Sequence, residues 1–215
     1  MIKLISILIV CLILSYLSDK VICFLCGEIE KNLKRLIVSN ICMLSLFLAV
    51  CIKYGKSVDT IKYLLLIPFI LIVSIIDIYS RNVYDLTVLS GIMVQGIIFI
   101  ISLKHGYIEW SYVFGLIIGV TISYILAVTT KSLGYGDVGF YGLCCFALGR
   151  EEAFYLIGLS FLTAFFYYIV IFIFKRDRLR RVIPFTPFIS LATIIIILTE
   201  NRLLELYVSF LYKIT

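Results

Sequence analysis

The chain has 215 residues, of which 63% are hydrophobic and only 15% charged, and its mean hydropathy is +1.15. This composition excludes a soluble globular protein. It predicts an all-α, polytopic helical membrane protein, because unbroken apolar runs of helix length do not fit the alternating pattern of a membrane barrel. The net charge of +6 lies in short loops, where basic residues set orientation, so the lipid bilayer rather than nucleic acid is the expected partner.

About eight hydrophobic segments are predicted, of which six to eight are expected to be true spans. They cover residues 1–17, 36–52, 61–76, 86–103, 111–130, 138–148, 153–174 and 183–198. The first is interpreted as a retained helix, because no cleavage site typical of a signal peptide follows it. The sixth is short for a crossing, since the hydrocarbon core needs about 20 residues. The whole chain, 1–215, is expected to form a single membrane-embedded domain.

The stretches between these segments are expected to be loops and turns. The main ones are 18–35, 53–62, 77–85, 104–109, 150–152 and the basic loop 175–181, and a hydrophobic tail follows at 203–212. Within the fifth segment, Gly115 and Gly119 have the spacing that allows two helices to pack closely.

The seven cysteines predict neither a disulfide framework nor a metal site. Most of them lie inside apolar runs, where cysteine behaves as a small hydrophobic residue, and their number is odd. Cys23-x-x-Cys26 supplies only two of the four ligands of a structural zinc site, and the only histidine, His105, is expected on the other face of the membrane. No metal or other cofactor is therefore expected.

Two aspartates stand at the boundaries of apolar segments. Asp77 ends the third segment, and Asp137 follows Gly134-Tyr135-Gly136, a bend in which glycine allows a sharp turn and a close approach of another part of the chain. Two predicted crossings separate the aspartates, so both are expected on the same membrane face. The alternative is that each aspartate only caps a helix or pairs with Arg81 or Lys131.

The distribution of basic residues predicts which face this is. With eight crossings, 11 lysines and arginines lie on the side of loop 175–181 and 8 on the opposite side. The positive-inside rule then places both termini outside and both aspartates at the cytoplasmic face of the plasma membrane. Two neighbouring carboxylates do not ionise together readily, so one keeps a proton, which is the requirement for acid–base hydrolysis of a peptide bond.

Three motifs resemble those of the type IV prepilin peptidases, also called leader peptidases. They are Gly134-Tyr135-Gly136-Asp137, Ile76-Asp77 with Asp85 eight residues later, and Ile183-Pro184-Phe185-Thr186-Pro187-Phe188, which resembles the Ile-Pro-Phe-Gly-Pro-like start of the last helix in that family. The resemblance covers about residues 64–195, the expected aspartic peptidase core.

The resemblance implies both the site and the substrate. Asp77 and Asp137 would be the catalytic pair, and Gly134, Gly136, Asp85, Pro184 and Pro187 would shape the loops and the substrate site. The substrate would be a prepilin or pseudopilin, contacted through its N-terminal leader and hydrophobic helix and cut after a glycine at the cytoplasmic face. Whether it serves a pilus, competence or secretion is left open.

The chain departs from the family pattern at two places. Tyr84 stands where the family usually has proline, and there is no room for the cytoplasmic domain with two Cys-x-x-Cys pairs, so N-methylation of the product is not expected. Two alternative functions are kept. One is a presenilin-like protease in which Tyr84-Asp85 precedes the Gly-x-Gly-Asp motif, and the other is a small transporter or assembly scaffold whose aspartates relay protons.

Overall fold

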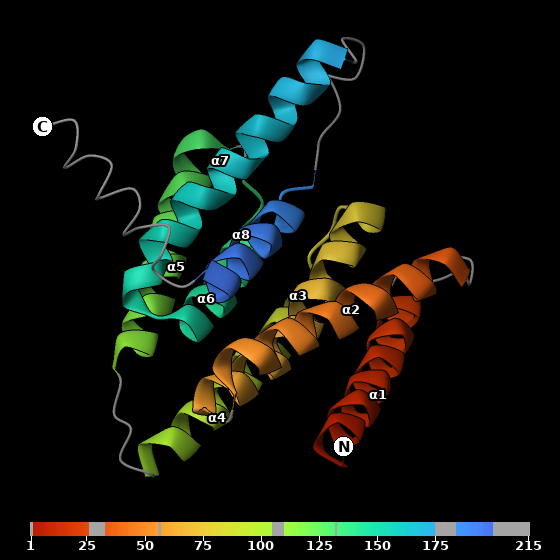
Figure 1. Cartoon of the computed structure of the whole chain (residues 1–215). Coiled ribbons are helices and arrows are strands. Elements are labelled where there is room, and N and C mark those ends of the chain that lie inside the picture. Colours follow the sequence, from red (N-terminus) through yellow and green to blue (C-terminus); the bar gives the residue numbers. More distant parts are fainter. Residues whose placement is uncertain are drawn as a thin grey trace, which may run out of the picture.

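A computed structural model describes residues 2–25, 33–55, 57–104, 110–131, 133–174 and 184–199, and in these ranges the chain forms eight helices and no strand (Figure 1). The helices are α1 (Ile2–Leu25), α2 (Leu33–Tyr54), α3 (Val58–Ser80), α4 (Asp85–Lys104), α5 (Ser111–Thr130), α6 (Tyr135–Leu148), α7 (Arg150–Phe174) and α8 (Thr186–Thr199). Cys26, His105, the basic loop 175–181 and the tail 203–212 lie outside the described residues.

Five of these helices are long and apolar enough to cross a membrane. They are α2, α3, α4, α5 and α7, as found by length and composition within the described part of the chain. In contrast, α6 and α8 have 14 residues each, and a helix of that length is about 21 Å long. The prediction of an all-α, polytopic helical membrane protein is confirmed.

Several predicted loops are shorter than expected because the helices extend into polar sequence. Helix α1 continues to Leu25, and its Asp19 pairs with Arg35 of α2 at 2.7 Å, so a charged residue is accommodated within the packed helices. Helix α3 continues past Asp77 to Ser80 and ends where Arg81 adopts a left-handed conformation with φ of 55°. The expected loop at 77–85 is thus wrong for its first four residues and for its last, Asp85, which begins α4.

The predicted turn at 150–152 is also wrong. These residues form the first turn of α7, where Glu151 and Glu152 lie at the positive end of the helix dipole, a favourable position for acidic side chains. The expected loop at 53–62 is reduced in the same way, since α2 reaches Tyr54 and α3 begins at Val58. In this chain, limits set at charged residues therefore make the predicted helices too short.

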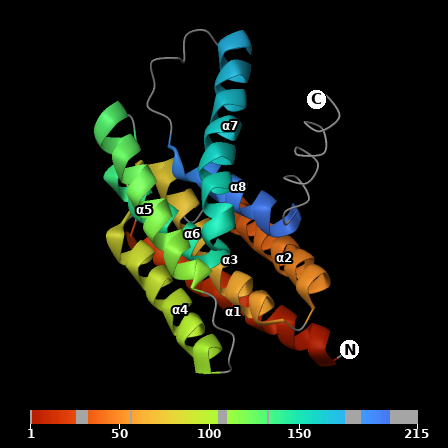
Figure 2. The same cartoon turned by 90° about the vertical axis from the view of Figure 1, so that its left-hand side faces the viewer.

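Helix α6 lies inside the bundle, in contact with α3, α4, α5, α7 and α8 (Figure 2). It packs most closely on α5, where a Cβ atom added at Gly115 would lie 2.4 Å from the Cys145 carbonyl oxygen and one at Gly119 would lie 2.6 Å from the Cys145 Sγ. The close packing predicted from the spacing of these glycines is confirmed, and its partner is α6. This contact brings the start of α6 to a fixed place among the longer helices.

Candidate active site

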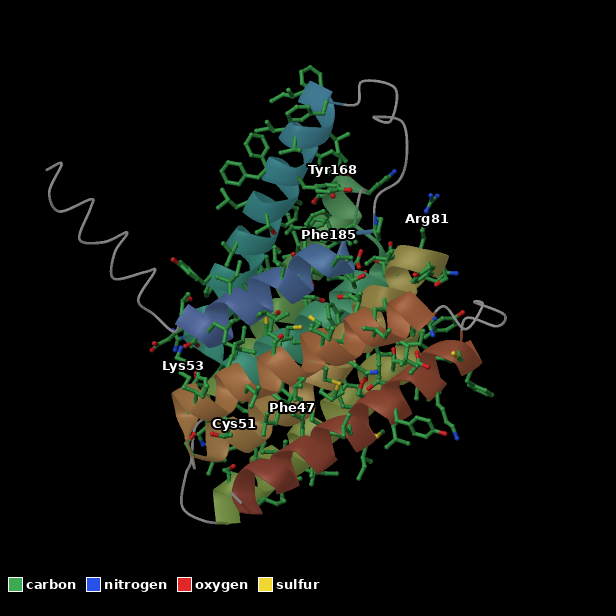
Figure 3. All side chains as sticks on the ribbon, turned by 45° about the vertical axis from the view of Figure 1, so that its right-hand side comes forward. Phe47, Cys51, Lys53, Arg81, Tyr168 and Phe185 are labelled. Carbon is green, nitrogen blue, oxygen red and sulfur yellow. The ribbon has the colours of Figure 1, made fainter. Side chains whose placement is uncertain are left out.

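Three helix ends meet at one end of the bundle: the C-terminal end of α3, the start of α6 and the start of α8. The backbone N–H of Thr186, the first residue of α8, donates to Oδ2 of Asp77 at 3.2 Å, and the Thr186 hydroxyl donates to the same oxygen. Figure 3 shows Arg81 and Phe185, which adjoin these helix ends, far from Lys53 and Cys51 at the opposite end of the bundle. The site therefore lies at a single end of the helix bundle.

Asp77 lies near the end of α3, and its side chain points into the bundle. Only 5% of the residue is exposed. Beneath it, the hydroxyl of Ser74 donates to that of Ser190 at 2.5 Å, and the Ser190 hydroxyl donates to the Thr186 carbonyl at 2.9 Å. This chain of buried hydrogen bonds joins α3 to the first turn of α8 and fixes the donors that face Asp77.

Asp137 occupies the first turn of α6 and is 8% exposed. Its Oδ2 accepts the backbone N–H of Gly134 at 3.1 Å, and its own backbone N–H donates to the Gly134 carbonyl at 3.1 Å, a reciprocal arrangement that closes the start of the helix. The helix-capping role considered from the sequence is thus present. Asp77 caps α8 in a comparable way, since it accepts the N–H of Thr186, so a capping role is common to both aspartates.

The two carboxyl groups are close enough to act on each other electrostatically. They come from different helices, and among the described residues neither is within ion-pair distance of Arg81 or Lys131. Two carboxylates in one buried site do not both ionise readily, so such a pair shares one proton. The arrangement can supply a proton donor and a proton acceptor at the same place, and general acid–base catalysis requires both.

Because Gly136 has no side chain, the loop after α3 can pack closely against the start of α6. A Cβ atom at this position would lie 2.6 Å from the Cβ of Val83, a distance that real Cβ atoms do not tolerate, whereas one at Gly134 would lie 3.2 Å from Oδ2 of Asp137. The Tyr84 hydroxyl donates to the Leu25 carbonyl at 2.9 Å, so the tyrosine found where the family usually has proline ties the same loop to the end of α1.

The other residues predicted for the site lie around this pair rather than in it. Asp85 is exposed and is the first residue of α4. Pro184 precedes α8, and Pro187 lies in its first turn, where a missing N–H is tolerated. Between them, the Phe185 ring packs against that of Phe161 with centroids 5.2 Å apart. The sequence analysis included Thr186 in the motif at the start of the last helix, but it did not predict that the Thr186 hydroxyl donates to Asp77.

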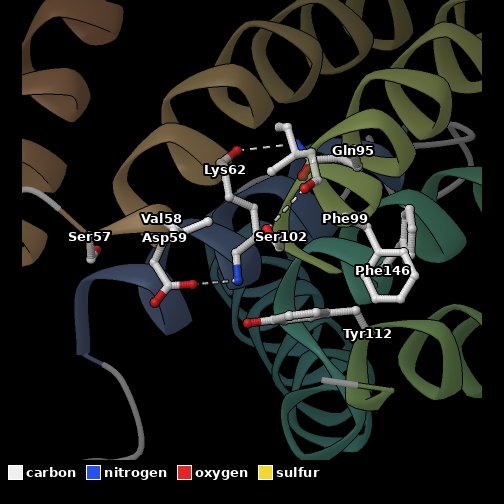
Figure 4. Close-up of a pocket in the computed structure, with 10 residues that line it drawn as sticks. Ser57, Val58, Asp59, Lys62, Gln95, Phe99, Ser102, Tyr112 and Phe146 are labelled. Carbon is white, nitrogen blue, oxygen red and sulfur yellow. Dashed lines mark hydrogen bonds and ion pairs between the residues drawn. The ribbon is translucent and has the colours of Figure 1, made fainter. Parts of the chain in front are cut away.

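A cavity of about 340 Å³ lies at the other end of the bundle, and neither Asp77 nor Asp137 lines it (Figure 4). Lys62 lines it, pairs with Asp59 at 2.7 Å and places its Nζ 4.0 Å from the centre of the Tyr112 ring. Lys62 is buried within α3 and is not the loop residue that the basic-residue count took it to be. This pocket is separate from the carboxylate pair and from the face on which that pair lies.

Comparison with known proteins agrees with the motifs. Residues 64–171, about half of the chain, match the model of the type IV leader peptidase family. The match includes Asp77 and Asp137 and ends before Pro184 and Pro187. No curated protein and no solved structure matches the chain. Because the family model covers at least half of its length, this chain belongs to the type IV leader peptidase family.

Proposed function

We propose that the protein is a membrane aspartic endopeptidase that removes the leader peptide of prepilins or pseudopilins at the cytoplasmic face of the plasma membrane. The observation that carries the proposal is the pair of buried, mutually interacting carboxyl groups of Asp77 and Asp137 within the residues that match a peptidase family. In this proposal the peptidase core extends to residue 195, beyond the matched residues, because α8 supplies the hydrogen bonds to Asp77.

The proposed chemistry needs one ionised and one protonated carboxyl group. The ionised group takes a proton from water as the water oxygen bonds to the carbonyl carbon of the scissile peptide, and the protonated group gives its proton to the carbonyl oxygen. In the second step the C–N bond breaks, and the leaving nitrogen takes the proton held by the first carboxyl group. A hydroxyl of the intermediate returns a proton to the second group, which restores both carboxyl groups.

The location of the pair supports a substrate that is itself anchored in the membrane. Both carboxyl groups lie at helix ends rather than in the middle of a span, so a peptide leaving a hydrophobic helix can reach them from the aqueous side. Helices α1, α5 and α7 end on this side, and the sequence that follows them, 26–32, 131–134 and 175–185, has more basic residues than the sequence between helices on the opposite side. A short basic leader followed by a hydrophobic helix fits this position at the cytoplasmic face.

Cleavage of a reporter prepilin tests the proposal directly. The reporter carries a basic leader that ends in glycine and precedes a hydrophobic helix, and it is co-expressed with this chain in cells without their own prepilin peptidase. We expect a shift in mobility equal to loss of the leader and a new N-terminus one residue after the glycine, measured by mass spectrometry. A reporter whose glycine is replaced by a bulky residue is the control. An unprocessed reporter in the presence of correctly inserted protein contradicts the proposal.

The cytoplasmic orientation predicts a labelling pattern. Asn82 is exposed in the loop after α3, and Lys104 is the last residue of α4, at the other end of that helix. In a variant without native cysteines, Asn82→Cys should resist a membrane-impermeant thiol reagent in intact cells and react after permeabilisation. Lys104→Cys should react in both conditions. The reverse pattern would place the carboxylate pair on the outer face and contradict the proposed orientation.

A further inference from the structure

The two carboxyl groups of the site have unequal hydrogen-bond partners. Oδ2 of Asp77 accepts two hydrogen bonds from Thr186, one from its backbone N–H at 3.2 Å and one from its hydroxyl. Among the described residues, Oδ2 of Asp137 accepts one, from the backbone N–H of Gly134 at 3.1 Å. A backbone N–H can only donate, and donors stabilise the charged form of a carboxyl group. The hydrogen bonds therefore favour a negative charge on Asp77 over one on Asp137.

Thr186 is held in the geometry that these hydrogen bonds require. The residue is 0% exposed, and its carbonyl accepts the Ser190 hydroxyl, which in turn accepts the Ser74 hydroxyl of α3. Threonine is branched at Cβ, so its side chain has few conformations to choose from. A helix dipole faces each carboxyl group, that of α8 at Asp77 and that of α6 at Asp137, so the two hydrogen bonds from Thr186 are what distinguish Asp77.

We propose that Thr186 is a positioning residue that keeps Asp77 ionised and leaves the shared proton on Asp137. Asp77 is then the group that takes a proton from the attacking water, and Asp137 is the group that gives its proton to the carbonyl oxygen. This inference rests on the proposed function. The hydroxyl is a feature of this chain, because the motif that the sequence resembles has glycine at the position of Thr186.

Replacement of Thr186 separates the effect of its hydroxyl from that of its shape. Thr186→Val has the same shape without the hydroxyl, and we expect kcat for the reporter prepilin to fall roughly 10- to 100-fold, the effect of one hydrogen bond to a charged group. KM should change less than about 2-fold, because a fully buried residue does not contact the substrate. Thr186→Ser retains the hydroxyl and should restore kcat to within about 3-fold of the wild type.

Thr193→Val is the matched control. Thr193 lies on the same helix, is also 0% exposed, and donates its hydroxyl to the Ile189 carbonyl at 2.8 Å rather than to Asp77. We expect this variant to keep kcat within about 3-fold of the wild type, since the hydrogen bonds that it loses, to the Ile189 carbonyl and to the Cys144 thiol of α6, do not involve Asp77. Thermal unfolding in detergent should give similar Tm values for Thr186→Val, Thr186→Ser and Thr193→Val. If Thr186→Val does not accumulate in the membrane, Thr186→Ala removes the hydroxyl without any added volume and replaces it in the comparison.

The outcomes separate this inference from the proposed function. A loss of kcat in Thr186→Val, rescued by Thr186→Ser and absent in Thr193→Val, supports it. Equal activities of Thr186→Val and the wild type overturn it, and so does an equal loss in Thr186→Val and Thr186→Ser, which would assign the effect to packing. In both of these cases the proposed function stands as long as Asp77→Asn is inactive. An active Asp77→Asn overturns the assignment of Asp77 to the catalytic pair and this inference with it, whereas an unprocessed reporter in the presence of wild-type protein overturns the proposed function.

Discussion

Asp77→Asn and Asp137→Asn should each reduce leader cleavage by about 10³-fold or more, whereas Asp85→Asn should keep most of the activity. An amide has nearly the volume of the carboxyl group but cannot hold or transfer the shared proton, and removal of a general acid or base costs about 10² to 10⁴ in rate. The measurement is the initial rate of cleavage of the reporter prepilin by each purified variant in detergent.

The structure explains why these substitutions should spare the fold. The amide oxygen of asparagine can still accept the N–H of Thr186 at position 77 and the N–H of Gly134 at position 137, so both helix starts stay capped. Asp85 is the matched control because, like Asp137, it is an aspartate in the first turn of a helix, but it is exposed. If Asp85→Asn were inactive and Asp77→Asn active, the catalytic pair would be Asp85 with Asp137, as in the presenilin-like alternative.

The sequence predicted the long hydrophobic segments well because their limits are set by lipid. Segments 86–103 and 111–130 agree with α4 and α5 almost residue for residue, since charged or polar residues flank each of them and the hydrocarbon core fixes their length. The ends of α3 and the start of α7 were predicted poorly. At these places polar side chains are buried among other helices or stabilise a helix start, so polarity does not mark the end of the helix.

The same distinction holds for the candidate site. The sequence predicted that Asp77 and Asp137 share a face, because that depends only on the number of crossings between them. It did not predict that Thr186 donates to Asp77 or that Val83 packs on Gly136, because these contacts join residues far apart in the chain. The glycine and proline motifs located the right segments, but only the packed structure shows which atoms they bring together.

The contact of Gly136 with Val83 leads to the second large effect that we expect. In Gly136→Ala the new Cβ would lie 2.6 Å from the Cβ of Val83, which is close to the backbone and cannot rotate away. The loop after α3 has to move, and it begins four residues after Asp77. A displacement of about 1 Å in a catalytic group can cost about 10²-fold, so we expect cleavage to fall roughly 100-fold while the protein still accumulates in the membrane.

Two further variants identify the cause of this loss. Gly139→Ala, on the same helix, brings its new Cβ 3.3 Å from a methyl group at the end of Val88, which can yield, so its activity should stay within about 3-fold of the wild type. Adding Val83→Gly to Gly136→Ala removes the clashing Cβ and should restore part of the lost activity. If the double variant were as inactive as Gly136→Ala, the loss would come from the start of α6 itself. Equal activity of Gly136→Ala and Gly139→Ala would show that the loop after α3 does not hold Asp77 in place.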